Sequence, residues 1–136
     1  MIKSLPPQVL VELLEASTLR VFWKDRDFRF LGCNQLFATD AGIDDPNHFV
    51  GKSDYYFFHP EQAAAFRADD AEVIRSGEAK IAIHERLTLI SGETVWVETN
   101  KIPLRDEAGE VVGLIGTYQD ITERKRAEAC DGRAAA

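Results

Sequence analysis

The stretch Val111-Val-Gly-Leu-Ile-Gly-Thr-Tyr-Gln-Asp-Ile-Thr-Glu-Arg-Lys125 runs a predicted strand directly into a predicted helix. Its first part, Val111 to Tyr118, is rich in β-branched and aromatic residues, which favour a strand. Asp120 and Thr122 can each cap a helix, and the charged residues that follow include no helix breaker. A strand that leaves a domain as a helix can carry a structural change out of that domain.

The composition indicates one acidic domain. A chain of 136 residues can bury roughly two-thirds of its unfolded surface in a single core. The net charge of -7, with no basic run longer than Arg124-Lys-Arg126, argues against a nucleic-acid partner. No apolar stretch approaches the ~20 residues of a membrane-spanning helix, and the N-terminus lacks the apolar segment of a signal peptide. We therefore predict a cytoplasmic chain without membrane contact, although a larger parent protein could be anchored.

The N-terminal half is predicted to hold short elements around two strands. Pro6-Pro7 opens a helix whose apolar stripe, Val9, Leu10, Leu13 and Leu14, needs a partner to cover it. Asn34 is expected to cap a short helix that stops at Gly42. The two strands, this short helix and a helical turn are expected at Arg20 to Lys24, Arg29 to Cys33, Gln35 to Ala41 and Gly51 to Phe58.

The C-terminal half is predicted to hold one long helix and three strands. His59-Pro60 is typical of a helix start, and Gly77 of a helix end. The strands are expected at Lys80 to Ile90, Thr94 to Leu104 and Val111 to Tyr118. Two strands separated from three by helices indicate an α+β fold, with a five-stranded antiparallel sheet and helices packed on one face.

This order of elements, together with several local strings, resembles PAS sensor domains. The strings are Val21-Phe-Trp-Lys-Asp25, Leu31-Gly-Cys-Asn-Gln-Leu-Phe37, Gly51-Lys-Ser-Asp54, Thr99-Asn-Lys-Ile-Pro-Leu-Arg-Asp106 and Gly116-Thr-Tyr-Gln-Asp-Ile-Thr-Glu-Arg-Lys125. The resemblance implies a flanking helix at 1–18, a PAS domain at 19–122, and the start of a signalling linker helix with its tail at 123–136. It also implies an input module of a bacterial sensor histidine kinase or cyclic-di-GMP enzyme, whose effector domain lies elsewhere in the same parent chain. The chain itself is not expected to be an enzyme.

Asp70 stands out on the predicted long helix. On a helical wheel it falls in the middle of the apolar face that Ala63, Phe66, Val73 and Ile74 form. A carboxylate there is costly unless it is paired or hydrogen-bonded. Two interpretations stay open: Asp70 caps a loop amide or sits at the rim in water, or it forms a wall of a polar cavity.

The strands repeat this mixture of apolar and charged positions. Glu85 interrupts the apolar series Ile81, Ile83, Leu87 and Leu89, and Val97 and Thr99 share a face with Lys101. The sequence resembles flavin-binding PAS domains around Trp96 and Pro103, which implies a cavity lined by Glu85, Leu87, Val97, Thr99, Lys101 and Tyr118, with Phe66, Asp70 and Lys24 as further candidates. We expect the cavity to bind a small polar or anionic metabolite. The alternative is an internal salt-bridge network that only stabilises the fold.

Cofactors can be weighed by the residues that they require in such domains. The covalent flavin bond needs a cysteine in the region Gly51 to His59, which has none, and haem needs a histidine in Pro60 to Ser76, which also has none. Both cofactors are therefore not expected, while non-covalent flavin stays open. The three histidines, His48, His59 and His84, show no metal-binding spacing. Cys33 and Cys130 lie far apart, which fits a reducing compartment, and Cys33 is expected to act as a small buried hydrophobe.

The expected mechanism runs from the cavity to the exit helix. Ligand binding would shift the sheet, and the shift would reach Asp120, Ile121 and Thr122, where a contact of Asp120 with Arg124 or Lys125 holds the helix. Two chains are expected to pair through the stripe at Val9, Leu10, Leu13 and Leu14, laid against the exposed sheet face. Two other functions stay open: a ligand-free dimerisation or relay module with a filled core, and a small acid/base enzyme that uses Asp70, Glu85 and Tyr118.

Overall fold

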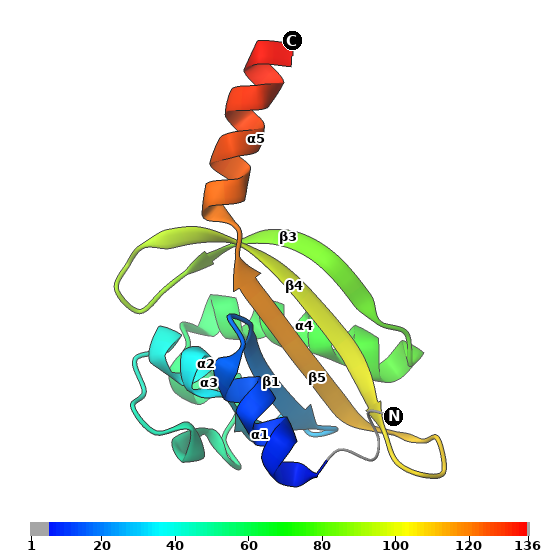
Figure 1. The fold of residues 1–136 in the computed structure, drawn as a ribbon. Coiled ribbons are helices and arrows are strands. Elements are labelled where there is room, and N and C mark those ends of the chain that lie inside the picture. Colours follow the sequence, from blue (N-terminus) through cyan, green and yellow to red (C-terminus); the bar gives the residue numbers. More distant parts are fainter. Residues whose placement is uncertain (1–5, 136) are drawn as a thin grey trace.

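The computed structural model describes the backbone of residues 6–135 and the side chains of residues 6–130. Its centre is a five-stranded sheet in the order β2-β1-β5-β4-β3, in which every neighbouring pair is antiparallel. The predicted fold class is confirmed, and Figure 1 shows α2, α3 and α4 together on one face of the sheet. The strands are β1 (Arg20–Asp25), β2 (Phe30–Cys33), β3 (Lys80–Thr88), β4 (Thr94–Arg105) and β5 (Val111–Asp120).

The helices begin and end where the sequence signals them. The Asn34 side chain accepts a hydrogen bond from the Phe37 N–H and so caps α2, and Gly77 ends α4 in the left-handed conformation with φ of 68°. A short 3-10 helix, η2, lies between α2 and α3, in a stretch for which the sequence analysis predicted no helix or strand. The helices are α1 (Pro7–Ala16), α2 (Gln35–Asp40), η2 (Pro46–Phe49), α3 (Asp54–Phe57), α4 (Pro60–Ser76) and α5 (Thr122–Ala135).

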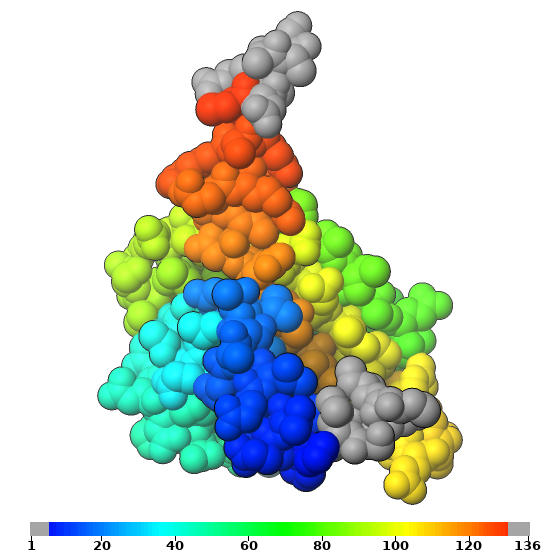
Figure 2. Space-filling model, viewed as in Figure 1, coloured from blue at the N-terminus to red at the C-terminus, as the bar shows by residue number. Residues whose placement is uncertain are grey.

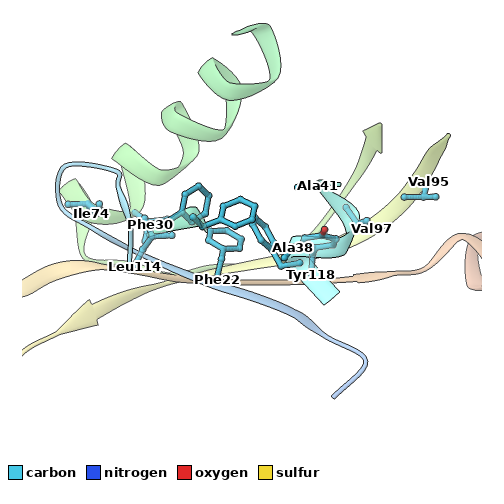
Figure 3. Packing of buried hydrophobic residues seen from close by; sticks show 12 residues of the cluster. Phe22, Phe30, Ala38, Ala41, Ile74, Val95, Val97, Leu114 and Tyr118 are labelled. Carbon is cyan, nitrogen blue, oxygen red and sulfur yellow. The ribbon is translucent and has the colours of Figure 1, made fainter. Parts of the chain in front are cut away.

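The hydrophobic core lies between the sheet and the helices that cover it. Figure 3 shows the rings of Phe22 and Phe30 gathered above the strands, near Leu114 of β5. Leu114 and Val73 of α4 are completely buried, and each such side chain contributes about 1.5–3 kcal/mol. Gly116 on β5 makes room for the Phe22 ring, because a Cβ atom at Gly116 would collide with it.

Strand β3 departs from the predicted alternation at its start. Lys80 pairs with Lys101, but Ile83 pairs with Thr99, so β3 holds one residue more than β4 over this interval. This bulge places Ala82 at φ 56° and leaves Ile81 67% exposed. The prediction that Ile81 continues the inward apolar series is therefore wrong, because the inserted residue reverses the direction of its side chain.

The two flanking helices behave differently from the core elements. Helix α5 projects away from the body of the domain (Figures 1 and 2), whereas α1 stays beside it. The end of α1 is tied to the domain where the Asn34 side chain donates to the Leu14 carbonyl at 3.3 Å, yet no residue of α1 is buried. Within residues 6–135, no helix combines the length and the apolar character that crossing a membrane demands.

Candidate functional site

A cavity of about 230 Å³ lies between the inner face of the sheet and helices α2, α3 and α4. Eight of the nine residues predicted to surround a cavity do line it: Lys24, Phe66, Glu85, Leu87, Val97, Thr99, Lys101 and Tyr118. They come from α4 and from four of the five strands, and period-two alternation directs the strand side chains to one face. Their role in ligand binding stays a prediction.

Asp70 does not line this cavity, in contrast to the prediction. It is buried as the helical wheel indicates, with 0% of its surface exposed, but it lies behind two lysines. Its carboxylate accepts from Lys24 Nζ at 2.6 Å and from Lys101 Nζ at 2.8 Å. Asp70 therefore holds the two ammonium groups in place, and the lysines form the cavity wall.

Asp54 completes this charged cluster. It follows Ser53 at the start of α3 and is buried. It accepts one hydrogen bond from Lys24 Nζ, which also donates to Asp70. Burial raises the pKa of Asp54 above its ordinary value, and the charge of Asp70 adds to this effect, while Lys24 offsets it only in part. An internal salt-bridge network, the alternative to a ligand site in the sequence analysis, is therefore present, but it contains Asp54 in place of Glu85. Its two lysines also face the cavity.

Glu85 stays apart from these lysines. Its Oε1 accepts the Thr99 hydroxyl at 2.8 Å, and within residues 6–130 no cationic group lies within 4.0 Å of it. The register explains this separation, because Glu85 pairs with Val97, four residues before Lys101 on β4. The predicted constellation thus splits into a lysine end and a glutamate end of one cavity.

Phenylalanine side chains make up much of the remaining wall. The sequence predicted only Phe66; the structure adds Phe22 of β1, Phe37 of α2, and Phe57 and Phe58 at the end of α3. Phe58 meets Phe66 edge-on with ring centroids 5.5 Å apart. A signal was available in the aromatic run Tyr55-Tyr-Phe-Phe58, but a four-residue helix gives no periodicity that separates inward from outward side chains.

Tyr118 reaches the cavity from β5 and is fixed by a residue that the sequence did not indicate. Its hydroxyl donates to Asp40 Oδ2 at 2.7 Å, and Arg20 Nε donates to the same oxygen at 2.9 Å. Burial, together with the Asp40 carboxylate, raises the pKa of Tyr118 well above its ordinary value. Asp40 lies at the last position of α2, where no sequence pattern indicates a cavity.

The junction between β5 and α5 is built on the backbone of Trp96 in β4. The Ile121 N–H donates to the Trp96 carbonyl at 2.8 Å, and the Trp96 N–H donates to Thr122 Oγ1 at 3.0 Å. Asp120 accepts the Thr122 N–H at 2.9 Å, which closes a turn at the helix start. All three predicted junction residues therefore hold the turn together, although Thr122 accepts from β4 instead of capping the helix.

The first basic residues of α5 do not contact Asp120, so that prediction is wrong. Arg124 donates to Glu98 of β4 at 2.9 Å, and Lys125 lies over the Trp96 ring at 5.1 Å from its centroid. His84 of β3 joins this group, with its Nε2 3.0 Å from the Glu98 carboxylate. Arg124 and His84 lower the pKa of Glu98. The helix is thus anchored to β4, because β4 runs beneath its first turn.

Neither the histidines nor the cysteines form a metal site in the described part of the chain, where no group of three potential metal-binding side chains occurs. Cys33 is half-buried, and burial together with the nearby charge of Glu15 raises its pKa from 9.0 to about 12. The thiol therefore stays protonated at neutral pH, in agreement with its expected packing role.

Comparison with known proteins identifies the family. Residues 14–126 match the family model described as the PAS fold. The chain is 32% identical over 117 residues to the aerobic respiration control sensor protein ArcB of Escherichia coli, covering 86% of this chain and 15% of that protein. It is 33% identical over 114 residues to the methanogenesis regulatory histidine kinase FilI of Methanothrix harundinacea, covering 79% of this chain and 12% of that protein.

The PAS domain of Bordetella pertussis BvgS shows the same fold, with a TM-score of 0.72 at 24% identity and coverage of 95% of this chain and 97% of that chain. The chain therefore belongs to the PAS fold family, as the sequence motifs predicted. It is a PAS sensory domain of the kind found in signalling proteins, and it spans about one-seventh or less of the two curated relatives.

Proposed function

We propose that this chain is the sensory domain of a larger signalling protein, in which a small molecule binds the cavity and shifts β4 and β5, and thereby moves α5. One observation carries the proposal. Val97 lines the cavity and pairs in register with Asp120, the residue at which β5 ends. The next residue along β4, Trp96, holds the start of α5 through its backbone. A displacement of the cavity wall therefore reaches the helix within one residue.

The size of the cavity supports a compact ligand. A closed apolar cavity of about 150 Å³ holds one benzene molecule. By that measure, a cavity of about 230 Å³ suits roughly nine or ten non-hydrogen atoms. A non-covalent flavin carries three fused rings and exceeds this size, so the proposal favours a small metabolite.

Two other functions have less support. A relay module with a filled core does not account for a cavity of about 230 Å³ lined by aromatic side chains. An acid/base enzyme would need Asp70 to face its substrate, but two lysines separate Asp70 from the cavity. The raised pKa of Tyr118 also makes that phenol a poor proton donor at neutral pH.

The relatives support a proposal for the remaining parts of the signalling protein. FilI is a histidine kinase, and this chain covers only 12% of it. We place a histidine kinase effector, or alternatively a cyclic-di-GMP enzyme, in the same parent chain, joined to this domain by α5. The ligand can change the output of the effector only if it binds the domain more tightly in one arrangement of the β5–α5 junction than in another.

The proposal includes a homodimer formed through α1. Val9, Leu10 and Leu13 are 39%, 43% and 55% exposed in the single chain, which leaves the apolar stripe without cover. Light scattering should give a dimer mass at micromolar concentration, and Leu13→Glu should reduce it to the monomer mass. Glu12→Lys, on the polar side of α1, is the control and should leave the dimer intact. A wild-type monomer would contradict pairing.

Ligand binding can be tested on the purified chain. Native mass spectrometry before and after denaturation should reveal a retained small molecule, and a metabolite panel should raise the melting temperature by mass action. If no molecule is retained and no metabolite shifts the melting temperature, the relay function replaces the sensor.

Transmission to α5 has a separate test. Binding should slow hydrogen exchange at the Ile121 amide, which donates to Trp96, and at the Lys125 amide, which donates to Ile121. Thr122→Val removes the acceptor of the Trp96 N–H and should weaken this response, whereas Thr122→Ser keeps the hydroxyl and should preserve it. Binding without any change in exchange at the junction would refute transmission.

A further inference from the structure

We propose that the cavity selects a compact, neutral, single-ring molecule that carries both a hydrogen-bond acceptor and a hydrogen-bond donor. The acceptor of the ligand receives a hydrogen bond from Lys101, and its donor gives one to Glu85. This inference rests on the proposed sensory function and assigns its ligand class. It follows from three features of the lining: an incompletely used ammonium group, an incompletely used carboxylate, and an aromatic wall.

Lys101 is the available donor at one end of the cavity. Its side chain is only 4% exposed, and within residues 6–130 its Nζ has a single hydrogen-bond partner, Asp70. An ammonium group has three N–H donors, so two are left for a ligand. Lys24 differs, because it donates to both Asp54 and Asp70. A buried donor without an acceptor is costly, which favours a ligand acceptor at Lys101.

Glu85 is the available acceptor at the other end. Its Oε1 accepts from Thr99, and its Oε2 has no partner in the described part of the chain. Thr99 and Lys101 are two residues apart on β4, or roughly 7 Å along the strand. The two polar ends therefore lie within reach of one small molecule that spans the inner face of β4.

The charges of the lining favour a neutral ligand over the anionic one that the sequence also allowed. The positive charges of Lys24 and Lys101 already face Asp54 and Asp70. Glu85 adds a negative charge without a cationic partner within 4.0 Å among residues 6–130. An anion would lose its hydration and meet no net positive field, so its desolvation would not be offset.

The wall between the polar ends selects the body of the ligand. Phe22, Phe37, Phe57, Phe58 and Phe66 all line the cavity, and aliphatic side chains such as Leu87 and Val97 add to its apolar surface. Aromatic rings favour a flat partner that can stack or meet them edge-on. Together with the volume, this indicates one ring with short polar substituents.

The test compares four probes of nearly equal size by NMR titration of the purified chain: benzamide, which has a donor and an acceptor; acetophenone, which has only an acceptor; ethylbenzene, which has neither; and benzoate, which is charged. Benzamide should bind at least tenfold more tightly than ethylbenzene, because hydrogen bonds to charged groups contribute on that scale. Acetophenone should fall between them, and benzoate should bind more weakly than benzamide.

Variants assign the two ends. Lys101→Met should weaken benzamide binding about tenfold or more, and Lys80→Met, which removes a partly exposed lysine bound to Asp69 at 3.5 Å, is the matched control. Glu85→Leu should weaken benzamide and leave acetophenone unchanged. Because a Lys101 variant could fold poorly, the ranking of the probes on the wild-type chain stands as an independent measurement.

The outcomes separate this inference from the proposed function. Ethylbenzene binding as tightly as benzamide, or benzoate binding more tightly, overturns the ligand class while leaving the sensory function intact. The same holds if the molecule retained after purification is a large or anionic one. If none of the probes binds, the ligand class is wrong. The sensory function is wrong as well if, in addition, no molecule is retained and no metabolite shifts the melting temperature.

Discussion

Replacing Asp70 by asparagine tests the charged cluster beneath the cavity. The substitution keeps the shape of the side chain but removes the negative charge that two buried lysines share at 2.6 and 2.8 Å. Breaking a buried ion pair by removing one partner costs about 3–5 kcal/mol, since the remaining charge is left uncompensated. Lys24 keeps its ion pair with Asp54, so Lys101 is the lysine that is left without a charged partner among residues 6–130. We expect a loss near the lower end of that range, about 3 kcal/mol.

Urea denaturation followed by tryptophan fluorescence measures this loss. Asp69→Asn is a matched control on the neighbouring position of α4, where the carboxylate is 38% exposed and lies 3.5 Å from Lys80. An exposed pair of this kind contributes about 0–1 kcal/mol. The free energy of unfolding should therefore fall several times further for Asp70→Asn than for Asp69→Asn.

The double variant Asp70→Asn with Lys101→Met sharpens the result. Removing the uncompensated ammonium should recover part of the stability that Asp70→Asn loses, because an apolar side chain of similar length carries no desolvation cost. Equal losses for Asp70→Asn and Asp69→Asn, or no recovery in the double variant, would show that the buried charges do not control stability in this way.

Three further predictions follow from single contacts. Gly116→Ala should cost about 1–3 kcal/mol in urea denaturation, because the new methyl group displaces the Phe22 ring; a stable variant would show that the ring can shift freely. The raised pKa of Cys33 predicts that the domain loses stability as the pH rises from 9.0 towards about 12, because the thiol ionises in the unfolded chain before it does in the folded chain. Cys33→Ala should therefore lose less stability between pH 8 and 10.5 than the wild type. Equal losses would contradict the raised pKa. Arg124→Gln should speed hydrogen exchange in the first turn of α5 several-fold while changing global stability by less than about 1 kcal/mol, since the ion pair with Glu98 is partly exposed; unchanged exchange would show that the pair does not hold the helix.

The sequence predicted the order of elements and the inward faces of the strands because both depend on regular periodicity, and the resemblance to flavin-binding PAS domains implied that these faces line a cavity. Alternation with period two placed Val97, Thr99 and Lys101 on one face of β4, and the helical wheel placed Asp70 among buried residues. Helix ends were also predictable, since Asn34 carries its own local signal.

The missed features depend on contacts between distant segments. The bulge at Ile81 is accompanied by a hydrogen bond from the Ala82 N–H to the Asn100 side chain at 2.9 Å, and nothing near Ile81 in the sequence signals that partner. Asp54 lies in a four-residue helix, which is too short to show a pattern. The pairing of Arg124 with Glu98 depends on the direction in which α5 leaves the sheet, which the helix sequence alone does not determine.

The cavity also has a consequence for the response of the domain to hydrostatic pressure. Unfolding lets water enter internal voids, so the system loses volume, and pressure shifts the equilibrium towards the unfolded chain. The apolar, enclosed part of the cavity, which measures about 230 Å³ in all, should add to this volume change in the domain without ligand. A ligand that fills this space removes part of the volume change on unfolding. The domain with bound ligand should therefore unfold at a higher pressure than the free energy of ligand binding alone predicts.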